Sequence, residues 1–169
     1  MPAIKSCLWF RTEAEEAANY YVSLFPNSKI VDALRAGGQV VAVEFLLDGR
    51  PFLAINGRPE SGFTDAVSFA IPCETQDEVD RYWNALVSGG EEGKCGWLTD
   101  RFGVSWQVVP NELTKLLGDP DPAKAGRAMQ AMLGMKKLNI GALRRARDGE
   151  VVARTAWAEA CARDGRREG

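Results

Sequence analysis

The sequence predicts an α+β fold in which a module of one strand, one helix and three further strands occurs twice and is followed by C-terminal helices. Two observations indicate this fold class. Thr12 and Thr75 each begin a Thr-x-x-Glu capping box, and each box follows an apolar run of strand length. Glycine-containing turns between short apolar runs follow each predicted helix, as is typical of β-hairpins. The repeated order indicates an internal duplication.

The first predicted module covers residues 1–60. An apolar strand over residues 4–10 precedes the capping box, and the helix after the box ends at Pro26. Three strands are predicted next, over residues 28–36, 39–47 and 51–56, and Asp48-Gly49 supplies a tight turn between the last two. One face of the helix carries its apolar residues, which are Ala14, Ala17, Ala18, Tyr21, Val22 and Phe25.

The second predicted module covers residues 61–112, after a stretch of linker composition at 58–65. Residues 66–73 alternate as a strand, and residues 93–110 predict a hairpin that turns at 99–103. A third strand can only be short, near residues 91–94. The apolar face of the helix between these strands comprises Val79, Tyr82, Trp83, Leu86 and Val87.

The remaining residues predict a helical extension over 113–150 and a tail over 151–169. Pro122 suits the first position of a helix that begins after Asp121. The apolar residues expected to share one face of this helix, for core or interface packing, are Ala125, Met129, Met132 and Leu133. For the tail, an amphipathic helix and a frayed end both remain open.

Composition excludes several classes of function. The chain has 169 residues, 46% of them hydrophobic, and a net charge of -2, which argues against nucleic acid as a partner. No apolar run is long enough to span a membrane, and no signal peptide is evident, so we expect a cytoplasmic protein without a membrane partner. The sequence contains no histidine, which excludes Ser-His-Asp and Cys-His catalysis and imidazole metal sites. Its four cysteines form no C-x-x-C pair and are interpreted as buried thiols rather than a zinc or redox motif.

Long strings along the chain resemble one known family. The sequence is similar to the PhnB-like branch of the vicinal oxygen chelate superfamily, which includes glyoxalase I, bleomycin-resistance proteins and extradiol dioxygenases. The resemblance covers about residues 2–148. The strings that carry it are PAIKSCLWF, EEAANYYVSLFPNSKI, VAVEFLLDGRPFLAING, AVSFAIPCETQDEVDRYW, GGEEGKCGWLTDRFGVSWQVVP, DPDPAKAGRAMQAML and MKKLNI.

The resemblance implies two βαβββ modules whose sheets form a curved wall around a cavity, usually in a homodimer. It also implies a divalent metal held by His and Glu side chains at four strand positions. Those positions correspond to Ser6, Asn56, Ala66 and Gln107 in this chain. Neutral side chains cannot replace two carboxylates and two imidazoles. We therefore expect a metal-free site and no cofactor.

The period of two along a strand, together with the implied cavity, predicts which residues reach a small-molecule ligand. The small and polar faces are expected to line the cavity, while Trp9, Val67, Phe69, Trp106 and Val108 pack under helices. The predicted ligand-binding residues are Ser6, Leu8, Phe10, Asn56, Ser68, Trp97, Ser105 and Gln107, with Ala54, Ala66 and Ala70 on the same faces.

Four of the candidate residues have open alternatives. Glu44 is either a catalytic base in the cavity, with a raised pKa, or a solvated surface acid. Trp97 is either a lid or stacking residue, or part of the core. Asn56 and Gln107 are either pocket amides or structural groups.

The function that these residues predict is binding or sequestering of a small planar or oxygen-rich ligand in a metal-free cavity. The alternative is an enzyme of vicinal-oxygen-chelate type, acting as a lyase, isomerase or dioxygenase, so enzymatic activity is left open. Members of the PhnB-like branch often carry the label 3-demethylubiquinone-9 3-methyltransferase. The sequence contains no G-x-G segment of the kind that the commonest S-adenosylmethionine fold requires.

Overall fold

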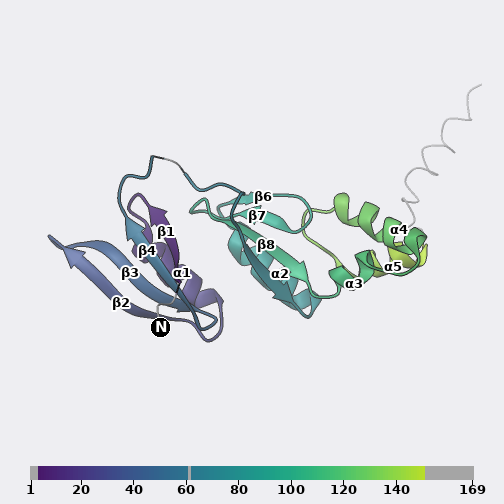
Figure 1. The fold of residues 1–169 in the computed structure, drawn as a ribbon, viewed down its shortest axis with the longest axis horizontal. Coiled ribbons are helices and arrows are strands. Elements are labelled where there is room, and N and C mark those ends of the chain that lie inside the picture. Colours follow the sequence, from purple (N-terminus) through teal and green to yellow (C-terminus); the bar gives the residue numbers. More distant parts are fainter. Residues whose placement is uncertain (1–3, 61, 151–169) are drawn as a thin grey trace, which may run out of the picture. The chain divides into compact units, whose positions relative to one another are not determined.

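The two predicted modules form two four-stranded sheets with corresponding strand orders (Figure 1). A computed structural model describes residues 4–60 and 62–150. In the first sheet the order is β1-β4-β3-β2, and β1 is parallel to β4; in the second the order is β5-β8-β7-β6, and β5 is parallel to β8. The predicted α+β duplication is therefore confirmed. The predicted tail at 151–169 lies outside the described residues.

The first module contains one helix and four strands, and the chain order is the predicted one. Its elements are β1 (Ser6–Phe10), α1 (Ala14–Leu24), β2 (Lys29–Ala36), β3 (Gln39–Leu47) and β4 (Arg50–Asn56). Ala14, Ala17, Ala18 and Tyr21 of α1 are buried, as their spacing predicts. The small alanine face leaves room for large strand residues beneath it, and Val43, Phe45 and Phe52 are buried.

The second module has the same order with shorter strands. Its elements are β5 (Phe69–Cys73), α2 (Gln76–Val87), β6 (Glu91–Glu92), β7 (Trp97–Thr99) and β8 (Ser105–Pro110). β6 is the predicted short strand. β5 begins three residues later than predicted, because the chain is still turning at residues 65–67, where the Ala66 N–H donates to Thr64 Oγ1. Ala66 and Ser68 therefore lie before the strand.

The two predicted capping boxes differ in outcome. Thr75 Oγ1 accepts a hydrogen bond from the Glu78 N–H at 3.2 Å, and Glu78 Oε2 accepts one from the Glu74 N–H at 2.7 Å, so the second box is present with its return bond shifted by one residue. The first box is wrong. Glu13 precedes α1 without a side-chain capping bond, and the Ala14 N–H instead donates to Asn56 Oδ1 at the end of β4.

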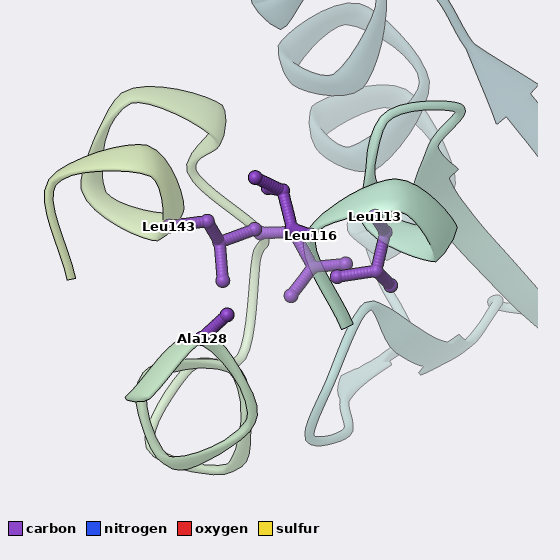
Figure 2. Close-up of a cluster of buried hydrophobic side chains, with 5 residues drawn as sticks. Leu113, Leu116, Ala128 and Leu143 are labelled. Atoms are coloured by element: carbon purple, nitrogen blue, oxygen red, sulfur yellow. The ribbon is translucent and has the colours of Figure 1, made fainter. Parts of the chain in front are cut away.

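The C-terminal extension forms its own small core (Figure 2). Its helices are α3 (Leu113–Leu117), α4 (Pro122–Leu133) and α5 (Ile140–Asp148). As predicted, Pro122 opens α4 after Asp121, whose Oδ1 accepts from the Ala123 N–H. The predicted face of α4 holds in part: Met132 packs against this core, whereas Met129 and Leu133 are exposed, so interface packing stays a prediction for them. Ala128, which was not predicted, is buried. The buried cluster comprises Leu113, Leu116, Ala128, Leu138 and Leu143.

The side chain of Gln76 ties the extension to the start of α2. Gln76 Nε2 donates to Leu138 O at 3.2 Å, and Gln76 Oε1 accepts from the Ile140 N–H at 2.9 Å. Beside them, Lys137 forms an ion pair with Asp80 at 2.7 Å, and this pairing lowers the pKa of Asp80. One amide therefore satisfies two backbone groups at the entry to α5.

The chain forms two compact units whose boundaries differ from those of the two modules. Among the described residues, the first compact unit comprises residues 4–60 and 62–68, Asn84–Glu91 and Thr99–Ser105. The second comprises Phe69–Trp83, Glu92–Leu98 and residues 106–150. Within the described residues, no helix has both the length and the apolar character needed to span a bilayer.

Candidate functional site

Cross-strand neighbours show which face of the first sheet α1 covers. Leu8 lies opposite Ala54, which lies opposite Val43, and all three side chains are buried. Phe10, on the same face, is 3% exposed and Leu8 is 5% exposed, whereas Trp9 is 47% exposed. The predicted assignment, with Leu8 and Phe10 on an open face and Trp9 under the helix, is therefore reversed. The alternation of side chains along a strand defines two faces of the sheet. Which of them packs against α1 depends on where the alanine surface of this helix lies.

The other face of the first sheet carries Glu44. One row of cross-strand neighbours on this face runs from Cys7 through Leu53 and Glu44 to Asp32. Glu44 forms an ion pair with Lys5 at 2.9 Å, and both side chains are roughly half-exposed, at 45% and 41%. Exposed ion pairs of this kind contribute about 0–1 kcal/mol to stability. The structure thus places Glu44 at a solvated surface beside a cation.

Cys7 begins this row on the edge strand β1 and is exposed, so the prediction of buried thiols is wrong for Cys7, whereas Cys73 is buried. Partial desolvation nevertheless raises the pKa of the Cys7 thiol. A raised pKa reduces the thiolate fraction at neutral pH, and the thiolate is the nucleophilic form. The chemistry of Cys7 is therefore that of a weakly reactive thiol.

Asn56 connects three elements of the first module through its amide group. Its Oδ1 accepts from the Ala14 N–H at 2.9 Å, and its Nδ2 donates to Val40 O at 3.0 Å. The last residue of β4 therefore holds the first turn of α1 and the start of β3. This is a structural role, one of the two alternatives that its sequence position left open, and ligand binding by Asn56 stays a prediction. Ser6, at the start of β1, is exposed and lies opposite Phe52.

The second sheet brings two predicted ligand-binding residues together. The Val108 N–H donates to Gly96 O at 2.8 Å and the Asp100 N–H to Val104 O at 2.9 Å, a register that places Trp97 opposite Gln107. Gln107 in turn lies opposite Ala70. Trp97 and Gln107 are half-buried, and Ala70 is exposed.

The opposite face of the second sheet is apolar and covered. Phe69 lies opposite Trp106, with ring centroids 5.3 Å apart, and Ile71 lies opposite Val108. Trp106, Val108 and Ile71 are buried. The predicted faces therefore hold for Ala70, Gln107, Trp106 and Val108. Val67, predicted to pack under a helix, is instead 71% exposed before β5, and Ser105, predicted on the open face, is buried. Two further candidates lie nearby in the chain: Ser105 is buried at the start of β8, and Ser68 is half-buried in the loop before β5.

The hairpin turn contains a buried carboxylate that sequence reasoning missed. Asp100 is 3% exposed. Its Oδ2 accepts from the Tyr21 hydroxyl at 2.7 Å, and its Oδ1 accepts from the Phe102 and Val104 N–H groups at 2.9 and 3.0 Å. Asp100 therefore both shapes the turn and binds α1 within the first compact unit.

Aromatic rings surround this carboxylate. The Phe102 ring lies 5.9 Å from each of the Tyr20 and Tyr21 rings, and the Arg101 guanidinium lies 4.0 Å from the centre of the Tyr20 ring. Burial raises the pKa of Tyr21, and the negative charge of Asp100 raises it further. Tyr21 therefore stays protonated and donates to the carboxylate.

The raised pKa of Tyr21 predicts a loss of stability at alkaline pH. In the unfolded chain Tyr21 ionises near its ordinary pKa of about 10, whereas the folded state retains the proton to higher pH. This contribution is fully present below about pH 10 and decreases by about 1.4 kcal/mol per pH unit above it. Urea denaturation between about pH 9 and about pH 11 should show that decline, and it should be shallower in Tyr21→Phe. If the free energy of unfolding fell equally steeply with pH in the native protein and in Tyr21→Phe, the raised pKa of Tyr21 would be contradicted.

The four positions that the family resemblance links to a metal do not fit one. The Ala66 side chain has no donor atom, and the neutral Ser6 hydroxyl is a far poorer ligand than a carboxylate. Both the oxygen and the nitrogen of the Asn56 amide are hydrogen-bonded to the backbone. Across residues 4–60 and 62–150, no group of three or more His, Cys, Asp or Glu side chains could hold a metal ion. The donor set of the described chain therefore disagrees with a divalent metal site at these positions.

Paired modules of one strand, one helix and three strands, in which the first and last strands are parallel neighbours, are the architecture of the vicinal oxygen chelate superfamily. Comparison with known proteins identifies the branch. The chain belongs to the PhnB-like family described as 3-demethylubiquinone-9 3-methyltransferase, whose family model matches residues 2–109. The match ends before α3, so the helical extension lies beyond it. No curated protein matches the chain in sequence.

Several solved structures are similar to this chain. A PhnB protein from Bacillus cereus is similar at 34% identity with a TM-score of 0.61, covering 64% of this chain and 99% of that one. A protein from Pseudomonas aeruginosa is similar at 20% identity with a TM-score of 0.56, covering 65% of this chain and 98% of that one. The fosfomycin resistance protein FosX from Listeria monocytogenes has 16% identity and a TM-score of 0.49, covering 68% and 97%.

Proposed function

We propose that this protein binds a small planar, oxygen-rich ligand without a metal ion, and that it acts by sequestering the ligand. The observation that carries the proposal is the pairing of Trp97 with Gln107 on the face of the second sheet opposite the half-buried Phe69 and the buried Trp106. An indole offers a flat apolar surface, and a neighbouring amide can donate to or accept from a ligand oxygen. Ala70, next to Gln107, leaves space beside them.

The donor chemistry supports binding without a Lewis acid. Gln107 corresponds to the position at which the superfamily has its last metal ligand, a glutamate. A neutral amide at this position is better suited to a hydrogen bond than to metal coordination. The methyltransferase in the family description has no comparable support in these residues. The sequence has no G-x-G loop, and its modules are hairpin-rich instead of the alternating βα units that the commonest S-adenosylmethionine fold uses.

Titration with anthraquinone sulfonate, a planar oxygen-rich probe, tests the proposal. Binding should quench tryptophan fluorescence and saturate. Trp97→Leu should weaken the affinity by about three- to tenfold, and Gln107→Ala by about threefold, because each removes one contact. Trp9→Leu is the matched control, since Trp9 lies on the first sheet and is also partly exposed.

Two results would contradict the proposal. Affinity lost in Trp9→Leu but retained in Trp97→Leu would place the ligand on the other sheet. Stoichiometric zinc, nickel or iron in protein purified without an affinity tag would favour the alternative, an enzyme of vicinal-oxygen-chelate type. The proposal retains the homodimer and the cytoplasmic location expected from the sequence, and the subunit number can be measured by light scattering.

A further inference from the structure

We propose that Asn56 is a deamidation site whose reaction the native fold holds back. The sequence contains six asparagines, and Asn56 is the one that precedes a glycine. Glycine has no Cβ, so its backbone nitrogen can approach the preceding side chain closely. The pair Asn56-Gly57 therefore has the residue types that favour cyclisation.

The reaction proceeds in two steps. The Gly57 backbone nitrogen loses its proton and attacks Cγ of Asn56, the bond from Cγ to Nδ2 breaks, and ammonia leaves from a five-membered succinimide. Water then adds to one of the two ring carbonyls. Opening on one side gives aspartate at position 56, and opening on the other gives isoaspartate, in which the main chain passes through the former side chain.

The native hydrogen bonds occupy every group that must react. The Gly57 N–H donates to Phe10 O at 2.9 Å, which opposes loss of its proton. Asn56 Oδ1 accepts from the Ala14 N–H at 2.9 Å, and Nδ2 donates to Val40 O at 3.0 Å, so Cγ cannot turn towards the Gly57 nitrogen. Cyclisation therefore requires local opening, in which β4 releases both β1 and the start of α1.

The two products differ in their effect on the first module. Aspartate keeps an acceptor for the Ala14 N–H at the N-terminus of α1, where negative charge is favourable, but loses the donor to Val40 O. Isoaspartate adds a main-chain carbon and breaks the register of Phe10 with position 56. Trp9 would report that change, because its Nε1 lies 2.4 Å from where a Cβ on Gly57 would be, so the indole packs directly on this backbone.

Ageing of the full-length protein tests the proposal. The native protein, the same protein unfolded in urea, and a synthetic peptide of residues 53–60 are incubated at mildly alkaline pH, and peptide mass spectrometry follows conversion of Asn56. We expect the native rate to be at least about tenfold below the unfolded rate, with the peptide matching the unfolded chain. Equal rates in native and unfolded protein would overturn the proposal.

A pair of variants tests the gating separately. Ala14→Gly loosens the first turn of α1 without touching Asn56, and it should raise the native rate several-fold while leaving the rate in urea unchanged. Ala131→Gly makes the same substitution in α4, outside this module, and should leave both rates as they are. A native rate that Ala14→Gly does not raise would show that the bond from Ala14 does not restrain Asn56.

Discussion

Replacing Asp100 with alanine is expected to lower the free energy of unfolding by about 3–5 kcal/mol. The carboxylate is buried and accepts hydrogen bonds from the Tyr21 hydroxyl and from two backbone N–H groups of the hairpin turn. Alanine leaves these donors without that acceptor in a site that excludes water, and an unsatisfied buried donor costs about 1–3 kcal/mol. Urea denaturation followed by circular dichroism measures the loss.

Two further variants separate the contributions of the turn and the helix. Tyr21→Phe removes one bond of Asp100 and keeps the turn, so we expect a loss of about 1–2 kcal/mol. Asp100→Asn keeps an oxygen for the two backbone groups and should fall between the other variants. In a double-mutant cycle, Asp100 and Tyr21 should couple by about 1 kcal/mol or more. A loss below about 1 kcal/mol in Asp100→Ala would contradict the proposed role.

Asp100 also shows where a sequence can guide prediction and where it cannot. The turn at residues 99–103 is predictable, because Asp and Gly at these positions are typical of turns, and an aspartate that bonds its own turn is a common local pattern. The partner hydroxyl comes from Tyr21, 79 residues earlier in the sequence. No local pattern specifies that pairing, so the burial of the carboxylate could not be anticipated.

The same distinction explains the errors in the first module. Element order, the buried face of α1 and the duplication follow from periodicity, and the structure confirms them. The first capping box fails because the first turn of α1 finds its acceptor in Asn56, 42 residues from Ala14 in the sequence. The faces of β1 are reversed because alternation is symmetric, and the choice depends on packing against a helix from elsewhere in the chain. In the second module Ala70 and Gln107 fall on the open face as predicted, but Ser105 on the same strand is buried, which alternation alone could not show.

Gly90→Ala is expected to be the most damaging glycine substitution, with a loss of about 3 kcal/mol or more. A Cβ on Gly90 would lie 2.1 Å from Thr99 O and 2.8 Å from Cα of Asp100. These are backbone atoms, so no side chain can rotate away, and the strand must move at the residue that holds the turn. The expected result is a lower urea midpoint together with loss of the Asp100 interactions, visible as faster hydrogen exchange of the Phe102 and Val104 amides.

Gly126→Ala provides the matched control for this steric argument. Gly126 lies inside α4, and a Cβ there would meet nothing within 4 Å. Alanine is favoured over glycine in a helix interior, so this variant should gain about 0.5–1 kcal/mol. The two substitutions add the same methyl group and should change stability in opposite directions. If Gly90→Ala were neutral, the close approach of residue 90 to the backbone of Thr99 and Asp100 could not exist in solution.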